Sequence, residues 1–143
     1  MKLLFVCTGN ICRSPMAAAI ARYEIAQAGW TDIEIASAGT AAVGGAPATR
    51  EAVMVAAENG LSLAGHHAQA LTPKLLAATD LVVGMERAHS ERAEQLGARR
   101  AITLISGPVP DPYGYGIAVY RETWALLSSG VPILLRELCA SPD

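Results

Sequence analysis

Short apolar runs alternate along the chain with longer stretches that have the composition of helices. Four of the runs are bounded by turn-forming residues and predict strands buried on both faces, at residues 3–6, 33–36, 81–83 and 101–104. Proline, glycine and capping residues place helices between and after them, at about 14–28, 47–59, 73–78, 86–96 and from 117 onwards. This alternation predicts an α/β fold, with a parallel sheet, helices on both faces and a functional site at the carboxyl ends of the strands.

Two places in this pattern predict irregular backbone. Pro132 lies inside the last predicted helix and is expected to break or kink it. Residues 37–40 are expected to form a turn after the second strand, followed by a loop over 41–46. The next helix is then expected to open at Pro47.

Length and composition predict one domain spanning residues 1–143. A chain of 143 residues is long enough for a single core and too short for two. Hydrophobic residues make up 52%, charged residues 17% and the net charge is −2, which excludes a strongly basic nucleic-acid-binding surface. No apolar run has the length of a signal-peptide core or a membrane span. We therefore expect a cytoplasmic protein, a monomer with neither a nucleic-acid nor a membrane partner.

The clearest chemistry lies in the stretch Cys7–Pro15, between the first predicted strand and the first predicted helix. Cys7 is followed six positions later by Arg13, then by Ser14 and by a proline suited to the first turn of a helix. Backbone N–H groups at a helix N-terminus are unpaired and, together with the helix dipole, favour an oxyanion in the turn. The stretch therefore predicts a phosphate-binding loop.

The residues of this loop also suit a cysteine nucleophile, which reacts as its thiolate. The helix N-terminus, the loop N–H groups and Arg13 all favour negative charge on Cys7, and Ser14 is placed to donate a hydrogen bond to its sulfur. The planar guanidinium of Arg13 can hold two phosphoryl oxygens. Gly9 allows a backbone twist, and Asn10 can bond back across the loop and hold it open.

The segment Val6–Pro15 resembles the signature of the low-molecular-weight protein tyrosine phosphatases, and residues 111–114 (Asp-Pro-Tyr-Gly) resemble the general-acid loop of that family. The likeness extends over most of the chain, through Ser37–Thr40, the segment from His66 to Thr72, and Asp80–Met85. The resemblance implies a four-stranded parallel sheet and a two-step hydrolysis that uses no metal and no cofactor.

The resemblance also implies a role for each residue of the site. Cys7 would attack phosphorus, and Asp111 would protonate the departing phenolate and then activate the water that hydrolyses the phosphocysteine. Arg13 and the loop amides would hold the transferring oxygens, the loop being Thr8, Gly9, Asn10, Ile11, Cys12, Arg13 and Ser14. Ser37 and His66 would support Asn10, and with Ser14 these residues would fix the loop.

The substrate cleft is expected to involve Ile11, Val43 and Tyr113. Tyr113 would stack on the substrate ring. Many relatives place an aromatic residue in the loop at 41–46, which here contains none, so Val43 or neighbouring backbone must form the opposite wall. Family members that hydrolyse phosphoarginine carry threonine where this chain has Ile11, which favours phosphotyrosine. We therefore expect a phosphotyrosine-containing protein substrate, with a tyrosine kinase as the corresponding partner.

Four alternatives compete with a tyrosine phosphatase. A protein arginine phosphatase shares this loop, and so does a thioredoxin-coupled arsenate reductase, which needs two further cysteines that are absent between Cys12 and Cys139. A non-catalytic phosphate-binding module would not need an acid at residue 111. A zinc site from Cys7, Cys12, His66 and His67 matches metal-ligand spacing only loosely, and Arg13 would repel the cation.

Cys12 has two interpretations. It could form a disulfide with Cys7 under oxidation and protect the nucleophile, a role that the family also suggests, or it could pack as a small residue beneath the loop. Cys139 has no evident partner and is expected to be a packing residue. Tyr115 and Tyr120 are expected on the surface of a loop and a helix.

Overall fold

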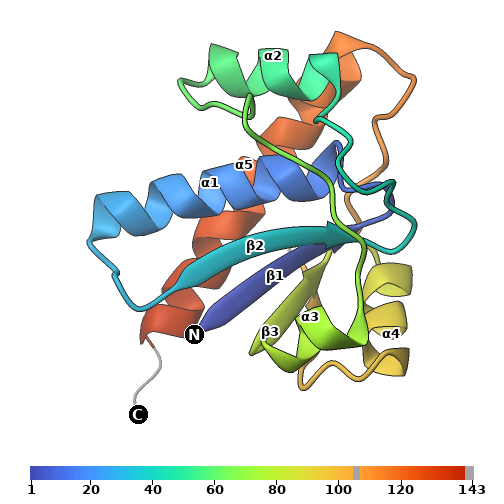
Figure 1. The fold of residues 1–143 in the computed structure, drawn as a ribbon. Helices are drawn as coiled ribbons and strands as arrows, with labels where there is room; N and C mark the ends of the chain where they lie inside the picture. The colour runs from blue at the N-terminus through green and yellow to red at the C-terminus, as the bar shows by residue number, and fades with distance from the viewer. Residues whose placement is uncertain (105–106, 141–143) are drawn as a thin grey trace.

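A four-stranded parallel sheet in the order β2-β1-β3-β4 forms the centre of the protein. Figure 1 labels the strands β2, β1 and β3. The computed structural model describes residues 1–104 and 107–140. The predicted α/β class is confirmed, with all its strands parallel. The elements are β1 Lys2–Cys7, α1 Arg13–Ala28, β2 Glu34–Gly39, α2 Arg50–Glu58, α3 Pro73–Ala77, β3 Leu81–Gly84, α4 Arg87–Gln95, β4 Ala101–Thr103 and α5 Ile117–Ala140.

Strand β1 lies in the middle of the sheet and is buried on both faces. Leu3, Phe5 and Cys7 pack in the cluster that α1, α2 and α5 cover, whereas Leu4 and Val6 pack in the cluster that α3 and α4 cover. Figure 1 shows these two groups of helices on opposite faces of the sheet. A strand buried on both faces needs apolar residues at successive positions, which is the pattern that residues 3–6 show.

Two glycines let the carboxyl ends of β2 and β3 approach their neighbours closely. A Cβ atom on Gly39 would lie 2.5 Å from the Thr8 carbonyl oxygen, and one on Gly84 would lie 2.6 Å from the Ser90 hydroxyl. Side chains at these positions would force the backbone apart. The glycines therefore allow β2 to lie against the loop after β1 and allow α4 to begin directly beside β3.

The structure corrects the predicted turn after the second strand and the predicted start of the second helix. Residues 37–39 belong to β2, which runs from Glu34 to Gly39, because they continue the pairing with residues 5–7 of β1. Helix α2 begins at Arg50 rather than at Pro47. Thr49 caps it, and its hydroxyl accepts a hydrogen bond from the Ala52 amide at 3.3 Å.

Of the two effects predicted for Pro132, a break or a kink, the break is wrong, since α5 continues from Ile117 to Ala140. Val131, Leu134 and Leu135 are buried against the core on either side of the proline. Their packing offsets the cost of a proline inside a helix, about 3 kcal/mol for the lost hydrogen bond and the ring clash together. Although α5 is long, neither it nor another helix within residues 1–104 and 107–140 has the length and apolar character to cross a membrane.

Two further expectations about burial are wrong. Tyr120 is 1% exposed and belongs to the core, because it lies on the face of α5 that packs against α1 and α2. Cys139, near the end of the same helix, is exposed instead of packed. Tyr115 is 73% exposed, as expected for a loop tyrosine.

Candidate active site

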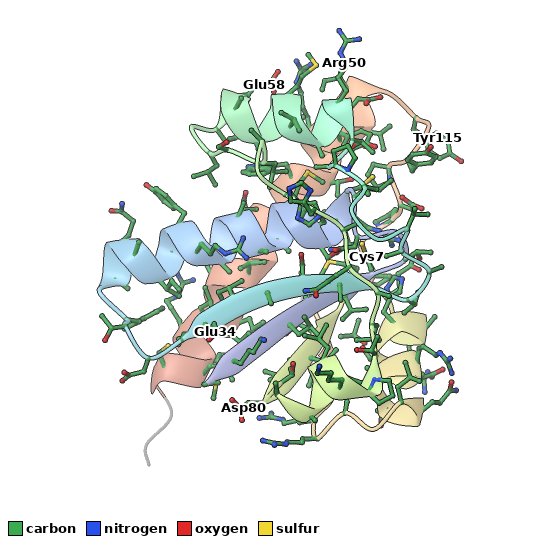
Figure 2. The ribbon with its side chains drawn as sticks, in the orientation of Figure 1. Cys7, Glu34, Arg50, Glu58, Asp80 and Tyr115 are labelled. Carbon is green, nitrogen blue, oxygen red and sulfur yellow. The ribbon has the colours of Figure 1, made fainter. Side chains whose placement is uncertain are left out.

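The loop between β1 and α1 surrounds a cavity of about 200 Å³ at the carboxyl end of the sheet. Figure 2 labels Cys7 at the end of β1 from which this loop departs. The residues that line the cavity come from the loop and from the segment before α5: Cys7, Thr8, Gly9, Ile11, Cys12, Arg13, Asp111 and Tyr113. The structure thus brings together two motifs that lie about a hundred residues apart in the sequence.

Cys7 ends β1 with its side chain buried and its sulfur in contact with two groups of Ser14. The Ser14 hydroxyl lies 2.9 Å from the sulfur, and the Ser14 amide donates to it at 3.5 Å. The Asn10 side-chain amide donates to the Ser14 hydroxyl at 2.8 Å, so the hydroxyl proton points at one of two acceptors, the sulfur of Cys7 or the Ala38 carbonyl at 3.4 Å. A thiolate at Cys7 is the stronger of these acceptors. Cys12, the N-cap residue of α1, makes no capping hydrogen bond with its own side chain. These donors and the helix N-terminus all stabilise a thiolate at Cys7.

Arg13 is 2% exposed and its guanidinium is fixed by several partners. Nη1 donates to the Val109 carbonyl at 3.0 Å and lies 3.4 Å from a carboxylate oxygen of Glu86. Nη2 lies 3.4 Å from the Thr8 hydroxyl and 3.8 Å from a carboxylate oxygen of Asp111. The buried Nε makes no hydrogen bond to the part of the chain that the structure describes. Its N–H is therefore available to a phosphoryl oxygen.

Asp111 lies in the loop that leads into α5 and reaches the same cavity. Its Oδ1 accepts a hydrogen bond from the Tyr113 amide at 3.1 Å, while Oδ2 is the oxygen nearest Arg13. The Arg13 bond to the Val109 carbonyl holds the start of this loop against the phosphate-binding loop. The side chain of Asp111 is about half exposed, at 51%, so it can exchange protons with water and with a bound ligand.

Asn10 holds the loop in a conformation that few residues adopt. Its φ angle is 56°, the left-handed region in which asparagine is among the better tolerated residues. The side-chain amide donates to the hydroxyls of Ser14 and Ser37 at 2.8 and 2.9 Å, and Oδ1 accepts from the Gln69 amide at 2.9 Å. The backbone carbonyl of Asn10 lies 2.6 Å from Nε2 of His66. Asn10 therefore contacts Ser37 and His66, the two residues that the family resemblance places beside it.

Residues 2–141 match the family model described as low molecular weight phosphotyrosine protein phosphatase. The chain belongs to this family. It is 36% identical over 132 residues to the protein-arginine-phosphatase of Bacillus subtilis, covering 86% of this chain and 87% of that protein. It is 35% identical over 133 residues to the low molecular weight protein-tyrosine-phosphatase Wzb of Escherichia coli, covering 87% and 86%. The family resemblance seen in the sequence is confirmed, and the protein is a hydrolase of this class.

A solved structure of the YwlE arginine phosphatase, in which a serine replaces the active-site cysteine and carries a phosphoryl group, superimposes closely on this member of the family. The TM-score is 0.91 and the sequence identity is 33%, with 97% of this chain and 96% of that chain covered. The similarity therefore spans the phosphate-binding loop, the sheet and the C-terminal helix alike.

Sequence reasoning missed two residues at the N-terminal end of α4 that contact the phosphate-binding loop, the N-cap Glu86 and His89. Glu86 caps the helix and lies beside Arg13, and His89, at the third position of the helix, accepts a hydrogen bond from the Glu86 amide through Nδ1 at 3.0 Å. Nε2 of His89 lies 2.9 Å from the Thr8 hydroxyl. Burial and the charge of Arg13 lower the pKa of His89. The spacing from Glu86 to His89, an N-cap followed by the N3 position, was the available signal.

Cys12 is buried beneath the loop and contacts two hydroxyl groups that the sequence analysis did not connect with it. Its sulfur lies 3.2 Å from the Tyr120 hydroxyl and 3.7 Å from the Thr49 hydroxyl. Burial raises the pKa of the Cys12 thiol. Cys12 therefore packs under the loop as a thiol, and it also lines the same cavity as Cys7.

Val43 does not form a wall of the cavity, contrary to expectation. The loop at 41–46 is held by bonds from the Ala41 amide to the Thr8 carbonyl and from the Gly45 amide to the Ala68 carbonyl. Between these anchors the side chain of Val43 projects into solvent and is 75% exposed. Ile11 and Tyr113 supply apolar surface on the walls of the cavity instead.

The zinc alternative finds no support in the arrangement of the side chains. Within residues 1–104 and 107–140, no three histidine, cysteine or acidic side chains gather as metal ligands. Cys7, Cys12, His66 and His67 all lie in this described part of the chain. His66 instead uses Nε2 to contact the Asn10 carbonyl.

Proposed function

We propose that the protein hydrolyses phosphotyrosine in protein substrates through a phosphocysteine intermediate at Cys7. One observation carries the proposal. The sulfur of Cys7, 2.9 Å from the Ser14 hydroxyl, lines a cavity that the guanidinium of Arg13 and the carboxyl group of Asp111 also line. Nucleophile, anion-binding group and proton donor thus converge on a space the size of a phosphoryl group and part of an aromatic ring.

In the first step the Cys7 thiolate attacks phosphorus in line with the bond to the phenolic oxygen. The S–P bond forms as the P–O bond breaks, and Asp111 in its protonated form donates its proton to the leaving phenolate. Arg13, through Nε and Nη2, and the amides of the loop bind the phosphoryl oxygens and stabilise the charge that develops on them. The half-exposed side chain of Asp111 suits this transfer at the mouth of the cavity.

In the second step water hydrolyses the phosphocysteine. Asp111, now a carboxylate, removes a proton from the water as it attacks phosphorus, the S–P bond breaks, and the thiolate and inorganic phosphate are released. The bonds from Ser14 to the sulfur stabilise Cys7 as a leaving group. The phosphorylated active-site serine of the YwlE variant supports a covalent intermediate at the corresponding place in this family.

The substrate preference rests on Ile11 and Tyr113, which give the cavity its apolar sides. An aromatic ring can stack on Tyr113 and pack against Ile11. A guanidinium at the same place would lose hydrogen bonds to water without gaining partners from Ile11. Phosphoarginine is the second candidate, because an arginine phosphatase is among the similar proteins at 36% identity. We further propose that the substrates are cytoplasmic proteins phosphorylated by a tyrosine kinase.

Turnover of an aryl phosphate in the presence of a chelator tests the proposal. We expect wild-type activity with p-nitrophenyl phosphate, none with Cys7→Ser, and a loss of roughly 10²–10⁴-fold with Asp111→Asn, the range for loss of a general acid. Cys139→Ser and Asp32→Asn are matched controls, since both residues are exposed and neither lines the cavity. Activity that survives Cys7→Ser, or disappears with the chelator, would overturn the mechanism.

A further inference from the structure

The side-chain hydroxyl of Thr8, in the phosphate-binding loop, lies close to both His89 and Arg13. Its hydroxyl oxygen lies 2.9 Å from Nε2 of His89 and 3.4 Å from Nη2 of Arg13, and Thr8 lines the cavity beside Cys7. The role assigned to Thr8 so far is that of a loop residue with a backbone amide. The geometry of its hydroxyl indicates a further role.

The tautomer of His89 follows from its other contact. The Glu86 backbone amide can only donate, so Nδ1 of His89, which lies 3.0 Å from that amide, must be the unprotonated nitrogen. A neutral His89 therefore carries its proton on Nε2 and donates it to Thr8. Burial favours this neutral form of His89, because the residue is only 3% exposed.

The direction of the Thr8 hydroxyl proton follows in turn. A hydroxyl oxygen has two acceptor positions and one proton. An arginine side chain has hydrogen-bond donors and no acceptor. Both close neighbours of the Thr8 hydroxyl, Nε2 of His89 and Nη2 of Arg13, therefore donate to its oxygen. The proton must then point away from both donors. Thr8 is exposed, and the open space on this side of it includes the cavity that it lines, so a phosphoryl group bound there lies within reach of the proton.

We propose that the Thr8 hydroxyl donates a hydrogen bond to the phosphoryl group in the transition state, and that His89 is the residue that aims it. The inference rests on the proposed function, since it adds a side-chain donor to the amides that bind the phosphoryl oxygens. Thr8 is the catalytic residue in this arrangement. His89 is a positioning residue, itself fixed by the N-terminal turn of α4 through the Glu86 amide.

Phosphate binding tests the role of Thr8 without requiring turnover. Inorganic phosphate is titrated by calorimetry into three proteins. The parent carries Cys7→Ser alone, and the other two carry Thr8→Val or Thr8→Ser in addition. Valine keeps the shape of threonine and removes the hydroxyl, so Thr8→Val should weaken binding by roughly 10- to 100-fold, as expected for a hydrogen bond to a charged group. Thr8→Ser, which retains the hydroxyl, should stay within about 3-fold of the parent. Equal affinity for all three proteins would overturn the proposal.

Kinetics with p-nitrophenyl phosphate test the role of His89. His89→Gln removes the ring Nε2 but keeps a side-chain acceptor for the Glu86 amide, since glutamine is a standard residue at this capping position. Both Thr8→Val and His89→Gln should lower kcat by roughly 10-fold or more, and the double variant should be no slower than Thr8→Val alone. The exposed His67 provides the matched control His67→Gln, which should leave kcat unchanged.

The outcomes separate this inference from the proposed function. Losses that multiply in the double variant would show that His89 acts independently of Thr8 and would overturn its positioning role, provided that the Tm of each variant shows it to be folded. A wild-type protein without turnover would refute the phosphatase proposal. The phosphate titration would still decide whether the Thr8 hydroxyl contacts the oxyanion.

Discussion

The sulfur of Cys12 lies 3.2 Å from the hydroxyl of Tyr120, although 108 positions separate the two residues along the chain. The contact joins the underside of the phosphate-binding loop to α5. The Thr49 hydroxyl, which caps α2, donates to the same tyrosine oxygen at 3.1 Å. One buried hydroxyl thus connects the loop with two helices on the same face of the sheet.

Tyr120→Phe should lower the stability of the protein. The substitution leaves the hydroxyl of Thr49 and the thiol of Cys12 without their buried partner, so the free energy of unfolding should fall by about 1–3 kcal/mol. Urea denaturation followed by circular dichroism measures the change. The exposed Tyr115 provides the control, and Tyr115→Phe should change stability by less than about 0.5 kcal/mol. Equal effects of the two substitutions would contradict the role assigned to the Tyr120 hydroxyl.

Cys12 should trap Cys7 after mild oxidation. Peroxide converts the Cys7 thiolate to a sulfenic acid, the Cys12 sulfur attacks it, and water leaves as the disulfide forms. Since burial raises the pKa of Cys12, the trapping step should accelerate as pH rises.

Mass spectrometry and recovery of activity by dithiothreitol measure this reaction. After peroxide, the mass of the wild-type protein should fall by two hydrogens, and dithiothreitol should restore its activity. The Cys12→Ala variant should instead gain oxygen at Cys7, and dithiothreitol should not restore its activity. Cys139→Ala should behave as wild type, since Cys139 is exposed near the end of α5. A Cys7 sulfinate in wild type, without a bond to Cys12, would refute the protective role.

Stability should decrease when the pH falls below about 6.5. Burial lowers the pKa of both His66 and His89 from the ordinary value of 6.5, so below that value the unfolded chain binds protons that the folded protein does not. The free energy of unfolding should therefore decline from about pH 6.5 down to the folded-state pKa values of the two histidines and show no further histidine-linked decline below them.

Denaturation curves from about pH 7 to about pH 5 test this dependence. His66→Gln and His89→Gln should each make the decline shallower, because each removes a group that protonates preferentially in the unfolded chain. Slopes that match wild type in both variants would show that other groups cause the acid sensitivity.

Ile11→Thr should shift the substrate preference towards phosphoarginine. A hydroxyl on the cavity wall can accept a hydrogen bond from a guanidinium that Ile11 leaves unpaired. The ratio of kcat/KM for phosphoarginine to that for phosphotyrosine should rise by at least about 10-fold. Ile11→Val keeps an apolar branched side chain and should leave the ratio within about 3-fold. A ratio unaffected by Ile11→Thr would mean that this wall does not select the substrate.

Much of the fold and the centre of the site could be predicted from local sequence. The apolar run at 3–6, followed by Cys7 and by Arg13-Ser14-Pro15, predicts a buried strand that turns into a helix N-terminus. The φ preference of asparagine and the helix-starting proline act within a few residues of their own positions. Such short-range effects do not depend on where the rest of the chain lies.

The supporting contacts could not be predicted in this way. Glu86 and His89 reach the loop because β3 lies beside β1 and because Gly84 lets α4 begin close to the sheet. Without the strand order, the sequence does not distinguish these two residues from the other polar residues around α4. Tyr120 was expected on the surface for the same reason, since only the packing of α5 against α1 and α2 decides which of its faces is buried.

The sequence by itself therefore determined the order of strands and helices and the chemistry of the loop, because both depend on neighbouring residues. The tertiary structure decided which distant groups surround that chemistry. In that structure Val43 is exposed to solvent, α5 continues through Pro132, and His89 contacts the hydroxyl of Thr8. Each of these outcomes depends on strand register and helix packing across the sheet, where favourable burial of the core outweighs local backbone preferences.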